Sequence, residues 1–391
     1  MTEQPENIFV AKAELEGRGA AVRAAMRERG VAVSIFTTPE NIHYVGGYHT
    51  RAITASQALI VSEDTDIVLV TRQMDAGNYL RIRDRSPITR HLTFTDDQMQ
   101  DSMQIIAATA RDLMKRQDGV GTEPDGSFMS PRQYDLLRAS LGDTEIVNIG
   151  AVVDTLRHVK SPFEVECHRR AGRMTVTAMN HAVAEVKAGV TDSAIAAEVA
   201  SSLIRAGSEW VATWPIIFTG HETGRAHSSW QNEAIRPGMP TALEFSAARQ
   251  RYHSPLFRTV IIAPTQEQIH LSEAVAKAHE AGLRTMRAGV TAEDVYLAER
   301  EVVASYGAVE LMSGRVGYAV GISFAPNWVQ RNGIDLMKGN RTVLQPGMVF
   351  HVATMLMRAN EFGIAHSATV VVTEDGNEVL TEDGVTGPIL R

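Results

Sequence analysis

Residues 241–262, TALEFSAARQRYHSPLFRTVII, decide the fold and hold the first candidate for chemistry. Two apolar runs, rich in β-branched and aromatic residues, flank a polar middle, and this pattern predicts a β-hairpin. A carboxylate, Glu244, lies inside the first run. Because an isolated carboxylate is costly to bury, Glu244 either lies on a solvated face or belongs to a functional site. The hairpin alone leaves both interpretations open.

The composition is that of a globular protein with room for two domains. Of its 391 residues, 44% are hydrophobic and 21% are charged. The formal net charge of -8 and the lack of dense lysine or arginine clusters argue against nucleic acid or an anionic membrane as a partner. No apolar run approaches the about 18 residues of a membrane span, and the first residues lack a signal-peptide pattern. With a single cysteine, Cys167, no intrachain disulfide is possible, so we expect a cytoplasmic protein.

The chain divides into two regions of different character. Helix-like and strand-like segments alternate over about the first 150 residues, which predicts a compact α/β domain. Ser161 and Pro162 then form a helix-start signal. Beyond it, helical runs and strand-like runs come in separate blocks, which is typical of an α+β domain. We therefore expect one domain at residues 1–158 and a second at 159–391.

Several polar and aromatic residues fall in or beside apolar runs of the second region. His227 lies in a loop ahead of the hairpin, Tyr318 lies between glycines, and His351 lies in an apolar strand. Taken singly, Tyr318 and His351 are more often satisfied core residues than catalytic groups. The sequence has no Walker phosphate loop, no Gly-x-Ser-x-Gly elbow, no His-Glu-x-x-His and no cysteine metal cluster.

Four motifs resemble those of one superfamily. They are VKSPFEVE at 159–166, RYHSPLFRT at 251–259, GYAVG at 317–321 and LQPGMVF at 344–350. Over nearly its whole length the chain resembles the methionine aminopeptidase/creatinase superfamily. The resemblance implies an α+β pita-bread catalytic domain preceded by a smaller α/β, ribonuclease H-like N-terminal domain. It also implies a homodimer, in which Arg51 of one subunit is a candidate contributor to the other subunit's site.

The resemblance also identifies the positions at which the superfamily's metallopeptidases hold two divalent ions. In those enzymes the ligands are two aspartates, a histidine and two glutamates. Here the corresponding positions are Glu244, Pro255, Tyr318, Ala353 and, approximately, Ser367. Only one carboxylate remains of five ligands, whereas two hard cations need several anionic oxygens or imidazoles. We therefore expect no metal and no cofactor.

Two metal-free branches of the superfamily are creatinase and ectoine hydrolase. His227 precedes Glu244 by seventeen residues, the spacing of creatinase's catalytic histidine. The two glutamates that grip creatine fall here on Phe257 and Ala353, which cannot accept hydrogen bonds from a guanidinium.

Ectoine hydrolase is more similar, at Glu244 and in the segments 251–259, 317–328 and 350–351. The chain departs from it in having APNWVQ at 325–330, where that branch has PPDWGE. It also has His-Ser-Ala at 366–368, where that branch has an acidic residue.

This resemblance implies a metal-independent hydrolase that opens a small cyclic amidine, such as ectoine, or a related C–N bond. Glu244 would act as nucleophile or as general base, and His227 would carry the proton. The residues expected to bind the small-molecule substrate are Tyr252, His253, Phe257, Tyr318, Phe324, Trp328, His351, Trp230 and Arg51. Arg258 is either a buried partner of an acidic group or a carboxylate clamp, and we favour the first role.

Three alternatives stay open. The protein could be a creatinase-like amidinohydrolase, a metal-dependent Xaa-Pro dipeptidase with an unusual site, or a non-enzymatic peptide-binding member of the fold. The ligand count argues against the dipeptidase. The pairing of Glu244 with His227 argues against the non-enzymatic module, because such a module has no reason to retain it.

Overall fold

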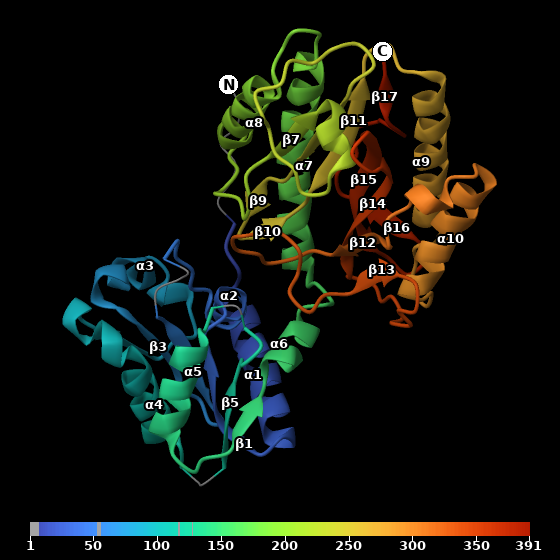
Figure 1. Ribbon diagram of the computed structural model, residues 1–391. Helices are drawn as coiled ribbons and strands as arrows, with labels where there is room; N and C mark the ends of the chain where they lie inside the picture. The colour runs from blue at the N-terminus through green and yellow to red at the C-terminus, as the bar shows by residue number, and fades with distance from the viewer. Residues whose placement is uncertain (1–7, 53–55, 116–117, 127) are drawn as a thin grey trace. The chain divides into compact units, whose positions relative to one another are not determined.

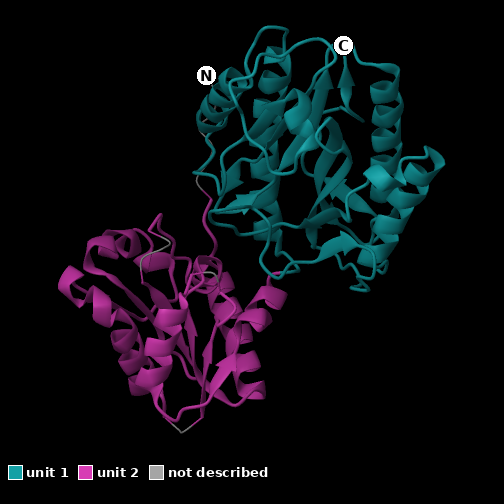
Figure 2. Ribbon diagram, in the orientation of Figure 1, with its two compact units in different colours: residues 1–7, 158–391 teal, residues 8–157 magenta. Residues whose placement is uncertain are grey.

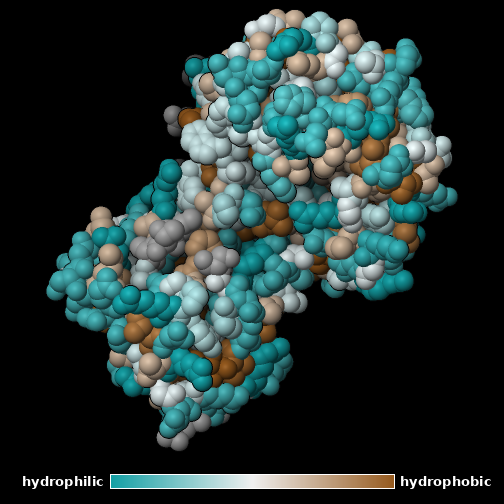
Figure 3. Space-filling model, in the orientation of Figure 1, coloured by the Kyte–Doolittle hydropathy of each residue, from teal (hydrophilic) through white to brown (hydrophobic). Residues whose placement is uncertain are grey.

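The computed structural model describes residues 8–52, 56–115, 118–126 and 128–391. These residues form two compact units, residues 8–157 and residues 158–391 (Figure 2). Each unit has its own β-sheet and its own hydrophobic core. On the face drawn in Figure 3, hydrophilic residues predominate and hydrophobic ones form small separate patches. Within the described residues, no helix has both the length and the apolar character that crossing a membrane requires.

The N-terminal unit is a six-stranded mixed sheet with helices (Figure 1). Its strands are β1 (Val31–Phe36), β2 (Ala58–Ser62), β3 (Ile67–Arg72), β4 (Arg90–Phe94), β5 (Gly119–Thr122) and β6 (Ile146–Asn148). Its helices are α1 (Lys12–Glu28), α2 (Pro39–Gly46), α3 (Ala76–Leu80), α4 (Ser102–Leu113), α5 (Pro131–Leu141) and α6 (Gly150–Leu156). The strand order is β4-β3-β2-β1-β5-β6, with β1 antiparallel to β2 and parallel to β5. The α/β alternation predicted from the sequence is confirmed.

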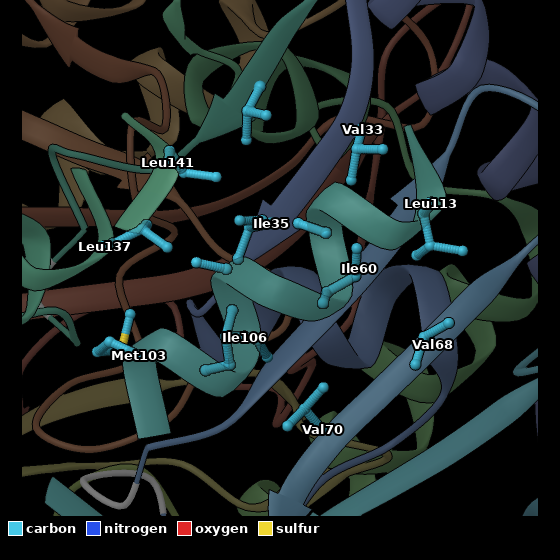
Figure 4. Close-up of a cluster of buried hydrophobic side chains, with 14 of the residues drawn as sticks. Val33, Ile35, Ile60, Val68, Val70, Met103, Ile106, Leu113, Leu137 and Leu141 are labelled. Carbon is cyan, nitrogen blue, oxygen red and sulfur yellow. The ribbon is translucent and has the colours of Figure 1, made fainter. Parts of the chain in front are cut away.

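One core cluster of this unit lies between the sheet and the helices α4 and α5. Ile35 of β1 and Ile60 of β2 belong to one buried cluster with Ile106 of α4 and Leu137 of α5 (Figure 4). Burial of each such side chain contributes about 1.5–3 kcal/mol. All residues of this cluster belong to the N-terminal unit.

The C-terminal unit is built on a nine-stranded sheet. Its strands are β7 (Ile216–Thr219), β8 (Pro240–Phe245), β11 (Leu256–Ile261), β12 (Arg315–Ala319), β13 (Asp335–Met337), β14 (Val349–Arg358), β15 (Phe362–Val372), β16 (Asn377–Val379) and β17 (Ile389–Leu390). The order is β13-β12-β14-β15-β11-β8-β7, with β16 beside β15 and β17 beside β11. The helices are α7 (Pro162–Glu185), α8 (Asp192–Arg205), α9 (Gln266–Thr285) and α10 (Ala292–Ser305).

All four helices of this unit pack on one face of its sheet. Side chains alternate between the faces of a strand. Leu243 and Phe245 of β8 are buried with residues of α7 and α8, while Val352 and Leu356 of β14 are buried with residues of α9 and α10. Residues of the opposite parity, such as Glu244, therefore point to the face that these helices leave uncovered.

The predicted hairpin at 241–262 is confirmed. β8 and β11 pair antiparallel, with Glu244 opposite Phe257. Its tip is a second small ladder, β9 (Ala248–Arg249) with β10 (Tyr252–His253). At the turn between them, Gln250 and Arg251 adopt left-handed φ values of 48° and 66°.

The predicted start of the long helix at Ser161 is also confirmed. Ser161 Oγ accepts a hydrogen bond from the Glu164 backbone N–H at 3.3 Å, and the Ser161 N–H donates to Glu164 Oε2 at 2.9 Å. Such a reciprocal cap satisfies two backbone donors that the first turn would otherwise leave unpaired. The Tyr252 hydroxyl donates to Glu164 Oε1 at 2.7 Å, which ties the hairpin tip to α7.

Candidate active site

A cavity of about 600 Å³ opens on the helix-free face of the C-terminal sheet. Glu244 of β8 and Phe257 of β11 line it, together with alternate residues of β14 and β15. The loops at residues 213–215, 225–230 and 326–329 complete its walls. A concave, largely apolar cavity of this size with a few polar groups is typical of a small-molecule site.

Glu244 supplies the carboxylate of this cavity. It lies between Ile216 of β7 and Phe257 of β11, and its side chain is only partly exposed, toward the cavity. Within the described residues it has no hydrogen-bond or ion-pair partner. Burial raises the pKa of the Glu244 carboxyl to about 7, since the surrounding protein removes much of its hydration. An uncompensated carboxyl with a pKa near neutrality is suited to nucleophilic or acid–base chemistry.

His227 lines the same cavity from a loop. Its backbone has a left-handed φ of 58°, and its side chain is exposed. The structure thus brings the two predicted catalytic residues to one cavity, although no hydrogen bond joins them among the described residues. Their cooperation in catalysis stays a prediction.

Tyr318 and His351 belong to one hydrogen-bonded chain. The Trp328 indole Nε1–H donates to the Tyr318 hydroxyl oxygen at 2.9 Å, and His351 Nδ1 is 2.9 Å from the same oxygen. His351 Nε2 is 2.7 Å from Ser367 Oγ. Burial is the main cause that lowers the pKa of His351, to about 3, so its ring is neutral. Burial, followed by the charge of Glu244, raises the pKa of Tyr318, which keeps the phenol protonated.

Apolar and aromatic side chains form much of the wall. Phe257, Trp328 and Trp230, all predicted to contact the substrate, line the cavity. Trp328 is almost wholly buried, whereas Trp230 is partly exposed and packs against the core below β8. These rings restrict the cavity to a small ligand.

The sequence analysis missed two cationic residues of the cavity. Arg225 and Arg315 both line it, and the Arg315 guanidinium stands 4.7 Å from the centre of the Tyr318 ring. Arg315 also donates to Asp335 Oδ1 at 2.8 Å. The pairing of β12 with β13 is irregular between Arg315 and Tyr318. The side chains of these two residues both line the cavity. Such a register shift has no clear sequence signal.

Four residues of the C-terminal unit that were predicted to bind the substrate do not line the cavity, and one of them is His351, which contacts Tyr318 instead. Tyr252 donates to Glu164, as described above, and Phe324 packs beside the Trp210 ring. His253 Nε2 accepts a hydrogen bond from the Ala212 N–H at 3.0 Å, and its Nδ1 is 3.0 Å from the Arg251 carbonyl. Both nitrogens of His253 are therefore occupied by the backbone.

Two other arginines considered in the sequence analysis, Arg51 and Arg258, lie outside this cavity. Arg51 lies in the N-terminal unit and is exposed, and its contribution to a partner subunit stays a prediction. Arg258 is buried and forms a bidentate pair with Asp383, with N–O distances of 2.8 and 2.9 Å. The structural role favoured for Arg258 is confirmed.

The donor set does not fit the superfamily's two-metal centre. Of the five ligand positions, Glu244 alone carries a carboxylate; Tyr318 and Ser367 are tied into the hydrogen-bonded chain, and Pro255 and Ala353 have no donor atom in their side chains. Across the described residues, no group of three or more His, Cys, Asp and Glu side chains is arranged to hold a metal ion. Two divalent cations need more anionic oxygens or imidazoles than these residues provide.

Comparison with known proteins gives two family matches. The model of metallopeptidase family M24 matches residues 166–374, and that of the creatinase/prolidase N-terminal domain matches residues 18–159. The ectoine hydrolase of Halomonas elongata is 27% identical over 385 residues, which cover 94% of this chain and 95% of that protein. The creatinase of Bacillus sp. strain B-0618 is 23% identical over 384 residues, covering 95% of this chain and 91% of that one.

A solved structure supports the same architecture. The prolidase from Thermococcus sibiricus superposes with a TM-score of 0.85 at 18% identity, and the match covers 96% of this chain and 99% of that chain. At this identity the likeness concerns the fold alone. The predicted combination of a pita-bread domain with a smaller α/β domain is confirmed.

Proposed function

This chain belongs to metallopeptidase family M24, and we propose that it is a metal-independent hydrolase of a C–N bond in a small cyclic amidine or related amide. The most specific form of this proposal is the opening of ectoine to N-acetyl-2,4-diaminobutyrate. The observation that carries it is the single unpaired carboxylate, Glu244, in a cavity whose other family ligand positions hold no acidic or imidazole side chain. The similarity to ectoine hydrolase over nearly the whole chain supports the same class.

In the proposed reaction, an oxygen of ionised Glu244 attacks the amidine carbon and forms a C–O bond. The bond from that carbon to one nitrogen then breaks, and the departing nitrogen takes a proton carried by His227. Water next attacks the same carbon, which releases the amide and regenerates the Glu244 carboxylate. Alternatively, Glu244 removes a proton from the water that attacks directly. The Tyr318 hydroxyl would donate to the charge that develops on the substrate.

The cavity presents both signs of charge, which suits a zwitterionic substrate. Glu244 supplies an unpaired carboxylate, while Arg225 pairs with Glu222 and Arg315 pairs with Asp335, so the walls carry both signs of charge. A carboxylate on the substrate would be attracted to the arginines while the amidine faces Glu244. Creatine fits less well, because Phe257 and Ala353 offer no acceptor for its guanidinium.

The test of this proposal is turnover in the presence of a chelator. Purified protein is dialysed exhaustively against EDTA and incubated separately with ectoine, hydroxyectoine, creatine and proline dipeptides. We expect ring opening of a cyclic amidine at an unchanged rate, with no gain on adding Mn²⁺ or Co²⁺. Chelator-sensitive cleavage of dipeptides together with two equivalents of bound metal would refute the proposal. Tight binding of peptides without turnover of any compound would favour the non-enzymatic module.

The raised pKa of Glu244 gives a prediction for the pH dependence. If Glu244 reacts in its ionised form, kcat/KM should fall about tenfold for each pH unit below about 7, because the ionised fraction of the free enzyme falls by that factor. The profile is measured from pH 5 to 9 on a substrate that does not itself titrate in that range. A kcat/KM that stays constant down to pH 5 would contradict an ionised Glu244 with this pKa.

The homodimer and the cytoplasmic location expected from the sequence stay predictions of this proposal. Sedimentation of the purified protein tests the first.

A further inference from the structure

A chain of four hydrogen bonds joins Trp328, Tyr318 and Phe257, which line the cavity, through His351 and Ser367, which do not. Trp328 Nε1 and Tyr318 Oη are 2.9 Å apart, as are Tyr318 Oη and His351 Nδ1. His351 Nε2 and Ser367 Oγ are 2.7 Å apart, and the Phe257 backbone N–H donates to Ser367 Oγ at 2.7 Å. Tyr318, His351 and Ser367 come from β12, β14 and β15, which are adjacent in the sheet.

The donor and the acceptor are known for the hydrogen bond at each end of this chain. An indole N–H and a backbone N–H can only donate, so the oxygens of Tyr318 and Ser367 each accept one hydrogen bond already. The ring of His351 is neutral and therefore carries a single N–H. The remaining hydrogens can then be arranged in only two ways, according to which nitrogen of His351 holds the proton.

With the proton on Nδ1, every hydrogen of the chain except that of the Tyr318 hydroxyl has an acceptor. His351 Nδ1–H donates to the Tyr318 oxygen, and the Ser367 hydroxyl donates to His351 Nε2. The Tyr318 oxygen then accepts from both His351 and Trp328. The hydrogen of the Tyr318 hydroxyl has no acceptor among the described residues, but Tyr318 lines the cavity that also contains Glu244, where water or a substrate can accept it.

With the proton on Nε2, the hydrogen left without an acceptor is instead that of the Ser367 hydroxyl, which does not line the cavity. His351 Nε2–H would donate to Ser367, and the Tyr318 hydroxyl would donate to Nδ1. The hydroxyl hydrogen of Ser367 would then have no acceptor among the described residues, and the Ser367 side chain is fully buried. A buried unsatisfied hydroxyl carries a penalty large enough to disfavour this tautomer by about tenfold or more.

We propose that Ser367 is a positioning residue that holds His351 in its Nδ1–H tautomer and thereby directs the Tyr318 hydroxyl hydrogen into the cavity. In this arrangement the Tyr318 hydroxyl is already oriented to donate a hydrogen bond to the substrate, and it stays protonated throughout. The effect on catalysis rests on the proposed function, whereas the tautomer of His351 is inferred from the hydrogen bonds alone. A carboxylate in place of the Ser367 hydroxyl would only accept from Nε2–H and would select the other tautomer.

The first test is spectroscopic and needs no substrate. Nitrogen-15 shifts of histidine side chains distinguish a protonated from an unprotonated ring nitrogen, and loss of one signal set in His351→Asn identifies His351. We expect the wild-type protein to show a protonated Nδ1 and an unprotonated Nε2. A protonated Nε2 as the main species would overturn the inference, whatever the enzyme's activity. Only the variant used for assignment, His351→Asn, has to fold for this test.

The second test uses variants of Ser367. Ser367→Ala removes the donor to Nε2, so we expect a mixture of tautomers and a loss of about 10- to 100-fold in kcat with little change in KM. Ser367→Thr keeps the hydroxyl and should retain the wild-type tautomer and most of the activity. Tyr318→Phe should cost much less in the Ser367→Ala background than in the wild type. Additive losses would refute a shared path, whereas absence of turnover in wild type would refute the proposed function alone.

Discussion

Glu244→Gln is expected to lower kcat by about 10³-fold or more on the substrate that the protein turns over. Glutamine keeps the size and shape of the side chain but has neither the negative charge nor the nucleophilic oxygen. Because Glu244 has no hydrogen-bond partner within the described residues, its replacement breaks no visible structural contact. Folding and substrate affinity should therefore change little, and the loss should appear in kcat. Stopped or continuous assays of purified variant and wild type measure the effect.

Glu299→Gln is the matched control for this variant. Glu299 is a buried glutamate of α10 in the same unit, but it does not line the cavity; its Oε2 accepts from the Thr354 hydroxyl at 2.7 Å. Burial raises the pKa of Glu299 well above its ordinary value, and glutamine keeps the size of the side chain and an oxygen that can accept from Thr354. Its activity should stay close to that of the wild type. If Glu244→Gln kept more than about a tenth of the activity, Glu244 would not be the catalytic carboxylate.

Much of the fold could be predicted because local patterns repeat at the right periods. The apolar runs on either side of residues 246–255 gave the pairing of β8 with β11, and the Ser161–Pro162 signal gave the start of α7. These features depend on nearest neighbours along the chain and on burial of one face. The orientation of Glu244 toward the helix-free face required the whole sheet, since alternation alone does not say which face the helices cover.

The binding residues were predicted less completely, for a reason visible at the hairpin tip. In a regular strand, His253 and Phe257 would point to the same face, because they are separated by an even number of residues. The chain instead turns through left-handed residues at Gln250 and Arg251, and His253 pairs in the separate small ladder. The alternation of side chains between the two faces is therefore interrupted in this segment. His253 bonds to backbone groups and does not line the cavity.

His351 shows why a sequence cannot separate a core role from a functional one. The same ring is fully buried, as expected of a satisfied core histidine, and is also bonded to a tyrosine that lines the cavity. Its role depends on Ser367, sixteen residues away and on the next strand. Only the pairing of β14 with β15 brings these two groups together.

Asp383→Ala is expected to destabilise the C-terminal unit by about 3 kcal/mol, because it leaves the buried Arg258 guanidinium without its counter-charge. Both side chains of this pair are only 2% exposed. We place the loss at the low end of the range for broken buried pairs for two reasons. Arg258 Nη1 keeps hydrogen bonds to the Phe257 and Ser367 carbonyls at 2.8 and 2.7 Å, and a second cavity of about 710 Å³ borders Arg258 and Asp383, so water can reach the remaining charge.

Tryptophan fluorescence in a urea titration isolates this effect, since all four tryptophans of the chain lie in residues 158–391. Glu280→Ala is the surface control: it breaks exposed pairs with Lys277 and Arg284 and should leave the urea midpoint almost unchanged. The double variant Arg258→Met with Asp383→Leu should be less destabilised than Asp383→Ala, because no lone charge stays buried. If the double variant were instead the least stable, the pair itself, rather than the penalty of an unpaired cation, would be what holds β11 and β15 to the C-terminal segment.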